Sequence, residues 1–419
     1  MKILWAVNTL SPYAAEALDI SSSHAISWVE AMSCELKGRE GVSLAIAVCG
    51  GKKVTSMIKK EIDSVTYYVL PYDVLRNDRW GEVISDFCPD IIHVYGCENA
   101  KNLPLIESYA KKYPMIISLQ GIIHAYHRYY YAGMTRGEIL TSITAGDLLL
   151  KRSIFHGKRR FKKQAELERR MLCGVSYVEG RSDWDRVFSE CVNRRLKYYH
   201  CPRMIRRPFY EKSWNAEGIE KHTILVHQAS YPIKGLHVML EALDIIRSYY
   251  PDVKMYIAGN IDFNPKTLKK KLLYTGYTRF IKKKIKKLGL ENNIEFTGYL
   301  DAEAMAQKLS RVNVCVVPSA IENAPNALAE AMLVGTPCVS SYAGGSPDML
   351  MDGKCGLLYR FEEPEMLAYR VRCYFDAPKL AADKSQCAKE IARSRHEPNK
   401  LCEILSGIYT QVISDYNGK

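Results

Sequence analysis

Short, continuous apolar runs alternate along this chain with longer stretches in which apolar residues recur at helical spacing. A continuous apolar run is typical of a strand that is covered on both faces, whereas a half-exposed strand alternates apolar and polar residues. Strands of this kind separated by helices predict parallel sheets. The strands that we expect are 3–7, 44–49, 66–70, 91–95, 115–119 and 175–178 in a first series, and 223–227, 253–258, 294–296, 312–317, 337–340 and 356–359 in a second.

Two series of strands predict an α/β protein with two doubly wound, Rossmann-like domains. The periodicity breaks at residues 202–214, where prolines and arginines interrupt it. After about residue 362 the chain becomes helical and polar, with no third series of strands. We therefore expect a first domain at 1–205, a second at 206–385 and a helical segment at 386–419.

The composition excludes several classes of protein. No run of 18 or more apolar residues occurs, so no membrane-spanning helix is expected, and residues 1–10 are expected to form a first strand rather than a signal peptide. The 13 cysteines include no C-x-x-C pair. Their scatter, partly within strand-like runs, favours reduced thiols in a cytoplasmic protein over a disulfide framework or a zinc site.

The net charge of +13 is concentrated in two segments, 151–170 and 266–287, which also contain apolar and aromatic residues. One interpretation is a solvated helix face. The other is adsorption to an anionic membrane surface, which would make the protein peripheral at the inner face of the cytoplasmic membrane. No helix-turn-helix, zinc-finger or RRM signature indicates nucleic-acid binding.

The most informative pattern is a pair of glutamates, Glu322 and Glu330, eight positions apart across the start of an expected helix. Asn323 is the expected N-cap, and Gly335 the expected end of the helix. At 1.5 Å per residue the two carboxylates lie up to about 12 Å apart along the axis, close to the length of a nucleotide joined to a sugar. The intervening backbone N–H groups of the first turn suit a diphosphate. These amides belong to Asn326, Ala327 and Leu328.

The segment VVPSAIENAPNALAEAMLVGTPCVSSYAGG at 316–345, which ends in Gly344 and Gly345, resembles the E-x7-E signature of the retaining GT-B glycosyltransferases of family 4. The resemblance implies the GT-B fold, with a C-terminal helix that crosses back to the first domain; residues 401–416 are the candidate. It also implies that Glu322 contacts the transferred sugar and Glu330 the ribose.

Further residues match the donor side of this family. SYPIKG at 230–235 resembles its K-G element, which makes Lys234 the donor-phosphate lysine and Ser230 a neighbouring contact. Relatives often carry an arginine before it, where this chain has Gln228 and Ala229; Arg181 or Arg207 is a possible substitute. The nucleobase loop of the family corresponds to residues 298–300. Gly298 and Tyr299 are the contacts that this match implies.

The acceptor side departs from the family pattern. Many relatives place a histidine after the fourth or fifth strand, whereas this chain has Gln120 there, with His124 and His127 downstream. Gln120 could hydrogen-bond a sugar hydroxyl but cannot titrate, and His124 is the candidate that can. For His93, a core histidine and a site residue are equally compatible with the sequence.

The resemblance implies an enzyme that transfers a sugar, with retention, from a nucleotide-diphosphate donor, a UDP-sugar, to a growing and lipid-linked glycan, as in capsule, exopolysaccharide or O-antigen assembly. The resemblance also implies that no metal or other cofactor is needed, because the dipole of the helix and a lysine replace the divalent ion. The alternatives are a GT-B nucleotide-sugar 2-epimerase and a catalytically inactive GT-B binding module. Transfer of a sugar to an acceptor would distinguish the glycosyltransferase from both alternatives.

Overall fold

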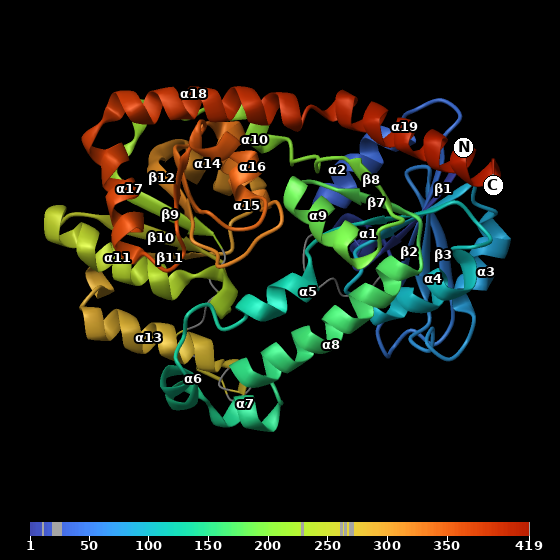
Figure 1. Cartoon of the computed structure of the whole chain (residues 1–419), viewed down its shortest axis with the longest axis horizontal. Coiled ribbons are helices and arrows are strands. Elements are labelled where there is room, and N and C mark those ends of the chain that lie inside the picture. Colours follow the sequence, from blue (N-terminus) through green and yellow to red (C-terminus); the bar gives the residue numbers. More distant parts are fainter. Residues whose placement is uncertain are drawn as a thin grey trace. The chain divides into compact units, whose positions relative to one another are not determined.

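The computed structural model describes residues 1–10, 12–18, 27–227, 230–259, 263, 266–267 and 272–418. The chain divides into two compact units (Figure 1). The first contains residues 1–124, 163–206 and 396–419, and the second contains residues 125–162 and 207–395. The expected break at 202–214 therefore falls at a boundary between the units.

The first unit is built on an 8-stranded sheet of order β3-β4-β2-β1-β5-β6-β7-β8. Neighbouring strands are parallel except for the pair β3 and β4. Its strands are β1 Lys2–Val7, β2 Ser43–Cys49, β3 Ile58–Ile62, β4 Val65–Leu70, β5 Ile91–Tyr95, β6 Met115–Ser118, β7 Tyr177–Gly180 and β8 Lys197–His200. Its helices are α1 Pro12–Ala17, α2 Ser27–Lys37, α3 Arg79–Phe87, α4 Leu103–Tyr109, α9 Asp183–Val192 and α19 Pro398–Asn417.

The second unit is built on a 6-stranded, wholly parallel sheet of order β11-β10-β9-β12-β13-β14. Its strands are β9 Glu220–His227, β10 Lys254–Ala258, β11 Ile294–Gly298, β12 Val312–Val317, β13 Cys338–Ser341 and β14 Leu357–Tyr359. Its helices are α6 Arg136–Ser142, α7 Ala145–Leu149, α10 Pro208–Glu211, α11 Leu236–Tyr249, α13 Gly276–Leu288, α14 Ala302–Arg311, α15 Asn326–Val334, α16 Ser346–Met349, α17 Pro364–Asp376 and α18 Pro378–Arg395. Two further helices, α5 Ile123–Tyr126 and α8 Ile154–Cys173, each include residues of both units.

The two doubly wound sheets confirm the predicted fold class, and every predicted strand is present. The prediction omitted β3 and β8, which are short edge strands whose exposed residues break the apolar pattern. In the second unit α11 packs on α13 and α17, while α15 packs on α10, α14 and α18. The chain proceeds from β9 toward one edge of the sheet and from β12 toward the other. Because the crossovers are right-handed, the helices that follow these strands cover opposite faces of the sheet.

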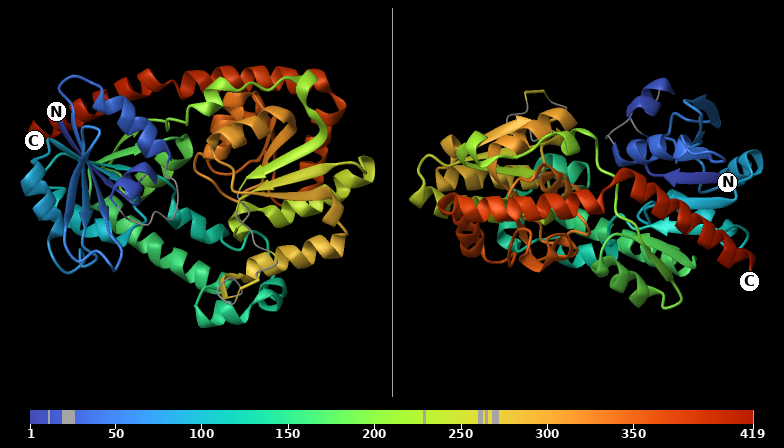
Figure 2. Two further views of the ribbon diagram at one scale, coloured as in Figure 1. Left: turned by 180° about the vertical axis from the view of Figure 1, so that it is seen from behind. Right: turned by 90° about the horizontal axis from the view of Figure 1, so that it is seen from above.

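The last helix belongs to the first unit, as the GT-B resemblance implied. Leu401, Leu405 and Tyr409 of α19 are buried in the same core cluster as Trp5 of β1. Both chain ends therefore lie in this unit (Figure 2).

The division of the chain differs from the expected domains in two places. Residues 125–162 belong to the second unit, because His237 Nε2 of α11 donates to the carbonyl of Ala132 at 2.7 Å and α6 packs on α13. Residues 386–395 also stay with the second unit, because they continue α18, which packs on α15 and α17. Neither contact is encoded in a local sequence pattern.

The expectation that all cysteines are reduced is wrong at one pair. Cys355 and Cys387 form a disulfide within the second unit. They are 32 positions apart, and the fold brings their Cα atoms to 5.0 Å by placing α18 against the segment before β14. Spacing alone gave no sign of the pair. No helix among the described residues is long and apolar enough to cross a membrane.

Candidate active site

The strand order of the second unit's sheet reverses between β9 and β12. From β9 the chain moves outward to β10 and β11, then returns to β12 on the other side of β9. The carboxyl ends of β9 and β12 are therefore neighbours whose loops diverge, which is where open parallel sheets bind ligands. Lys234 follows β9 and Glu322 follows β12.

Lys234 and Glu322 form an ion pair between the loops that follow β9 and β12. Lys234 Nζ lies 2.5 Å from Glu322 Oε1, and the Ser319 hydroxyl donates to the same oxygen at 3.0 Å. Burial alone would lower the pKa of Lys234, but the Glu322 carboxylate and Tyr231 raise it overall. The lysine is thus held as an ammonium.

Three loops at this edge are joined by backbone contacts that require glycine. Gly235 has φ +70°, and a Cβ there would lie 1.6 Å from the carbonyl oxygen of Pro318. Gly344 has φ +57°, and a Cβ there would lie 1.6 Å from the carbonyl oxygen of Glu322. That oxygen accepts from Gly345 N–H at 3.1 Å. The contacts of Gly344 and Gly345 therefore fix the position of the Glu322 backbone.

Helix α15 begins at the same edge, but not as the sequence predicted. Its N-cap is Pro325, with no side-chain cap, so the expectation that Asn323 caps the helix is wrong. Leu328 N–H donates to the Pro325 carbonyl at 3.0 Å and is not available to a ligand, contrary to expectation. Asn326 and Ala327 precede the first intrahelical bond, and neither is buried.

Glu330 lies one turn further along α15 and is buried. Its Oε2 is 4.0 Å from His227 Nε2, at the end of β9. The structure thus brings Lys234, Glu322, Glu330 and the start of α15 to the carboxyl ends of β9 and β12, within a single unit.

The other predicted donor-side residues lie on neighbouring loops. Ser230 is exposed between β9 and Lys234. Gly298 has φ +73° and its carbonyl accepts from Gly259 N–H at 2.9 Å, while Tyr299 beside it is exposed. Arg207 is also exposed and pairs with Glu211 at 2.6 Å. Gln228 and Ala229 lie outside the described residues.

The predicted acceptor-side residues lie in the first unit, apart from His127. His124 is buried, and its Nδ1 is 2.6 Å from the fully buried Glu168 carboxylate, which also accepts from His124 N–H. Arg181 is buried and donates to the carbonyl of Gln120 at 2.5 Å. Asp185 accepts from the backbone N–H of Arg181 at 2.8 Å.

His93 is a core histidine. It is fully buried on β5, with Nδ1 2.6 Å from Tyr409 Oη and Nε2 2.6 Å from Ser118 Oγ. Burial lowers the pKa of His93, so the neutral imidazole is the stable form.

A polar cluster that no local sequence pattern predicts lies at the corresponding edge of the first unit. Here β1 and β5 are neighbours at which the strand order reverses. Asn8 Nδ2 donates to Glu98 Oε1 at 2.7 Å, and Asn99 Nδ2 donates to Asn8 Oδ1 at 3.1 Å. Burial raises the pKa of Glu98 to about 7. Asn8 is 90 positions from Glu98 and 91 from Asn99 in the chain, so only the fold shows these contacts.

Comparisons with known proteins agree with this architecture. Residues 207–391 match the family described as glycosyl transferases group 1. An uncharacterized glycosyltransferase of Methanocaldococcus jannaschii is 22% identical over 80% of this chain and 87% of its own length. A D-inositol 3-phosphate glycosyltransferase of Streptomyces griseus is 26% identical over 44% of this chain, and the match spans only 38% of that protein.

Solved structures share the fold over the whole chain. Sucrose-phosphate synthase from Thermosynechococcus elongatus has a TM-score of 0.69 at 14% identity, covering 99% of this chain and 100% of its own. HepE of Anabaena, solved in complex with UDP-glucose, has a TM-score of 0.65 at 18% identity. The match covers 98% of this chain and 100% of the HepE chain. The chain therefore has the GT-B fold of these structures, and residues 207–391 match the glycosyl transferases group 1 family.

Proposed function

We propose that this protein is a retaining glycosyltransferase that transfers a sugar from a nucleotide-diphosphate donor, a UDP-sugar, to a growing glycan. The observation that carries the proposal is the Lys234–Glu322 ion pair beside the accessible start of α15, at the point where the strand order of the second sheet reverses. HepE, which shares the fold, was solved with UDP-glucose, and this supports the choice of donor.

The donor diphosphate would lie on the N–H groups of Asn326 and Ala327, where the helix dipole favours negative charge. An ammonium has three N–H donors, so Lys234 can bind a phosphate oxygen while it keeps its bond to Glu322. Glu322 would accept from a hydroxyl of the sugar and Glu330 from the ribose. Of the three N–H groups that were expected to bind the diphosphate, only that of Leu328 is excluded, because it donates to the Pro325 carbonyl.

In the reaction, the bond between the anomeric carbon and the phosphate oxygen breaks, and its electron pair goes to that oxygen. The acceptor hydroxyl oxygen bonds to the same face of the carbon, and its proton passes to the leaving phosphate. Lys234 and the α15 amides stabilise the charge that develops on the nucleotide. No divalent ion has a role in this scheme.

We further propose that the acceptor is a lipid-linked glycan of capsule, exopolysaccharide or O-antigen type, used at the cytoplasmic face of the membrane. The basic segments 151–170 and 266–287 support this location, because anionic lipid attracts exposed lysine and arginine.

The test is transfer of labelled sugar from a panel of nucleotide sugars to the lipid-linked glycans of the host, with the anomeric configuration read by NMR. Lys234→Ala should lower turnover about 100-fold, as the loss of an oxyanion-hole donor does. Glu330→Ala should chiefly weaken donor binding and Glu322→Ala chiefly slow transfer, each by about 1.5–3 kcal/mol.

Two controls separate the alternatives. EDTA should leave the rate unchanged; loss of activity that magnesium or manganese restores would contradict the metal-free scheme. Donor without acceptor should stay intact, and its conversion to an isomeric nucleotide sugar would instead indicate the 2-epimerase.

A further inference from the structure

Five leucines are exposed on one part of the second unit, and three of them are consecutive. Leu148, Leu149 and Leu150, at the end of α7, are 61%, 70% and 47% exposed. Leu140 of α6 and Leu273, just before α13, are 59% and 53% exposed. We call these five residues the leucine tip. Three consecutive exposed apolar residues are rare unless they serve a binding function.

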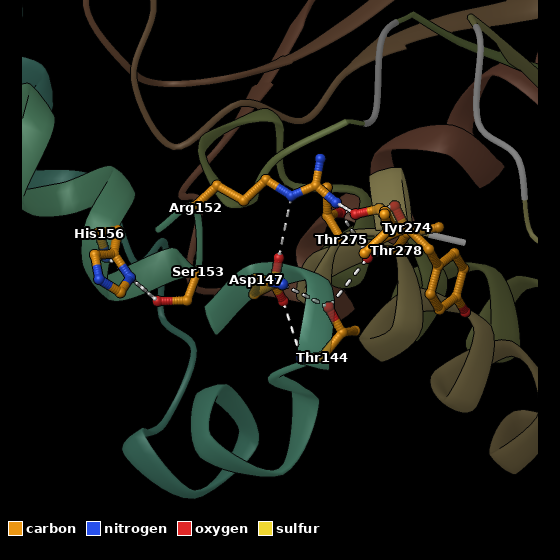
Figure 3. Close-up of polar contacts among 9 residues, drawn as sticks. Thr144, Asp147, Arg152, Ser153, His156, Tyr274, Thr275 and Thr278 are labelled. Carbon is orange, nitrogen blue, oxygen red and sulfur yellow. Dashed lines mark hydrogen bonds and ion pairs between the residues drawn. The ribbon is translucent and has the colours of Figure 1, made fainter. Parts of the chain in front are cut away.

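The leucine tip is held in place by partly buried polar contacts (Figure 3). The side chains of Thr144 and Asp147 form a capping box at the start of α7, and Asp147 is fully buried. Thr144 Oγ1 also donates to the Tyr274 carbonyl at 3.2 Å. Arg152 lies 3.8 Å from Asp147 and donates to the Leu272 carbonyl. The leucines are therefore exposed by an ordered turn.

The same contacts bring the leucines of separate segments together. A Cβ on Gly146 would lie 2.5 Å from the Leu272 carbonyl oxygen, so α7 packs directly on the backbone beside Leu273. Arg279 of α13 donates to the Ile143 carbonyl at 3.0 Å, in the connection between α6 and α7.

Cationic side chains surround this surface. Lys151 directly follows Leu150 and is exposed. Lys283 Nζ donates to the Thr141 carbonyl at 3.3 Å, next to Leu140. Residues 125–162 contain eight lysines and arginines and two acidic residues, of which Asp147 is buried. The solvent-facing charge beside the leucines is therefore positive.

We propose that the leucine tip inserts into an anionic lipid surface while the surrounding lysines contact the headgroups. Protein–protein interfaces are enriched in aromatic residues and depleted in lysine, whereas apolar side chains within a lysine-rich rim are typical of interfacial membrane binding. The inference deepens the proposed function, because it supplies the contact that would bring the site to a lipid-linked acceptor. The exposure of the leucines does not depend on that function.

The experiment compares flotation of the full chain with neutral phosphatidylcholine vesicles and with vesicles that also contain phosphatidylglycerol. The wild type should bind the anionic vesicles only. The double variant Leu148→Ser/Leu149→Ser should lower the partition coefficient at least about tenfold, because two leucine side chains no longer enter the hydrocarbon. Leu149→Trp should bind more tightly, since tryptophan favours the membrane interface.

The matched control is Leu75→Ser, which removes a leucine of similar exposure, 58%, in the first unit. It should bind vesicles as the wild type does. Equal binding by the double variant and the wild type, or no binding by the wild type, would overturn the proposal. So would a wild-type dimer that the double variant dissociates, since the surface would then be an interface between two copies.

Transfer to a water-soluble acceptor analogue, measured without vesicles, separates this proposal from the proposed function. The double variant should transfer at the wild-type rate there. If neither the wild type nor the double variant transfers sugar, the proposed function fails. The flotation result still decides whether the leucine tip binds lipid.

Discussion

Glu98 is a carboxyl group whose proton should affect the stability of the first unit near neutral pH. Burial is the largest cause of its raised pKa, Glu168 adds to it, and Arg203 opposes it. The folded-state pKa of about 7 exceeds the ordinary value of 4.5. The unfolded chain thus releases this proton at lower pH than the folded chain does. The stabilising contribution of Glu98 is complete below pH 4.5 and is lost as the pH rises through 7.

Glu98→Gln should therefore stabilise the protein at pH 8, by about 2 kcal/mol, and have little effect at pH 4.5. The amide keeps an oxygen that can accept from Asn8. The measurement is urea denaturation of both proteins at several pH values. Glu61→Gln, which changes an exposed carboxyl in the same unit, is the control. A difference that is independent of pH would contradict the assignment.

The residues of the candidate site differ in how far the sequence could predict them. Lys234, Glu322 and Glu330 lie in local motifs, so their approximate places were predicted. Glu98 and Asn8 meet only through the pairing of β1 with β5, which leaves no local pattern. The role of His93 was also undecided until its bond to Tyr409, more than 300 positions away, was known.

At the scale of elements, the loops after β9, β12 and β13 behave as one structure. Gly235 contacts the backbone before Glu322, and Gly344 contacts Glu322 itself. Ala320 N–H donates to the Ile233 carbonyl at 2.7 Å, which joins the first two loops directly. A change at either glycine should therefore displace the Lys234–Glu322 pair.

Gly344→Ala should destabilise the protein by about 2–4 kcal/mol, because a Cβ would collide with backbone and φ is positive. It should also lower sugar transfer, since Glu322 must move. Gly407→Ala is the matched change: Gly407 is exposed within α19, and nothing lies within 4 Å of its Cβ position. That variant should gain about 0.5–1 kcal/mol. Thermal unfolding together with the transfer assay checks both, and a neutral Gly344→Ala would refute the coupling of the loops.

Elements were predictable where the apolar pattern decides their position, as it does for the buried strands of both sheets. The N-cap of α15 was not, because Asn323, Pro325 and Asn326 all suit a helix start.

At the scale of the whole molecule, the core of the first unit includes side chains of α19, which is far in sequence from the strands that it covers. Trp5 Nε1 donates to Tyr409 Oη at 2.9 Å across 404 positions, and α19 contributes Leu405 and Tyr409 to the core. Residues 125–162 lie in the chain between two segments of the first unit but belong to the second unit. The sequence indicated two units and a returning helix, but the interleaving of the units depends on long-range contacts that no local pattern encodes.

Tyr409→Phe tests how far the first unit depends on this closure. The variant keeps the ring but leaves the Trp5 N–H without its acceptor and His93 Nδ1 without its partner, both in the buried core. A buried polar group left unsatisfied costs about 1–3 kcal/mol, so the free energy of unfolding should fall by about 2–4 kcal/mol. Tyr416→Phe, which removes an exposed bond from the same helix to the Lys111 carbonyl, should cost less than about 1 kcal/mol. Urea denaturation followed by circular dichroism measures both changes. Equal losses in the two variants would show that the tyrosine hydroxyl at the core adds nothing beyond surface contact, and that α19 is held by its apolar side chains alone.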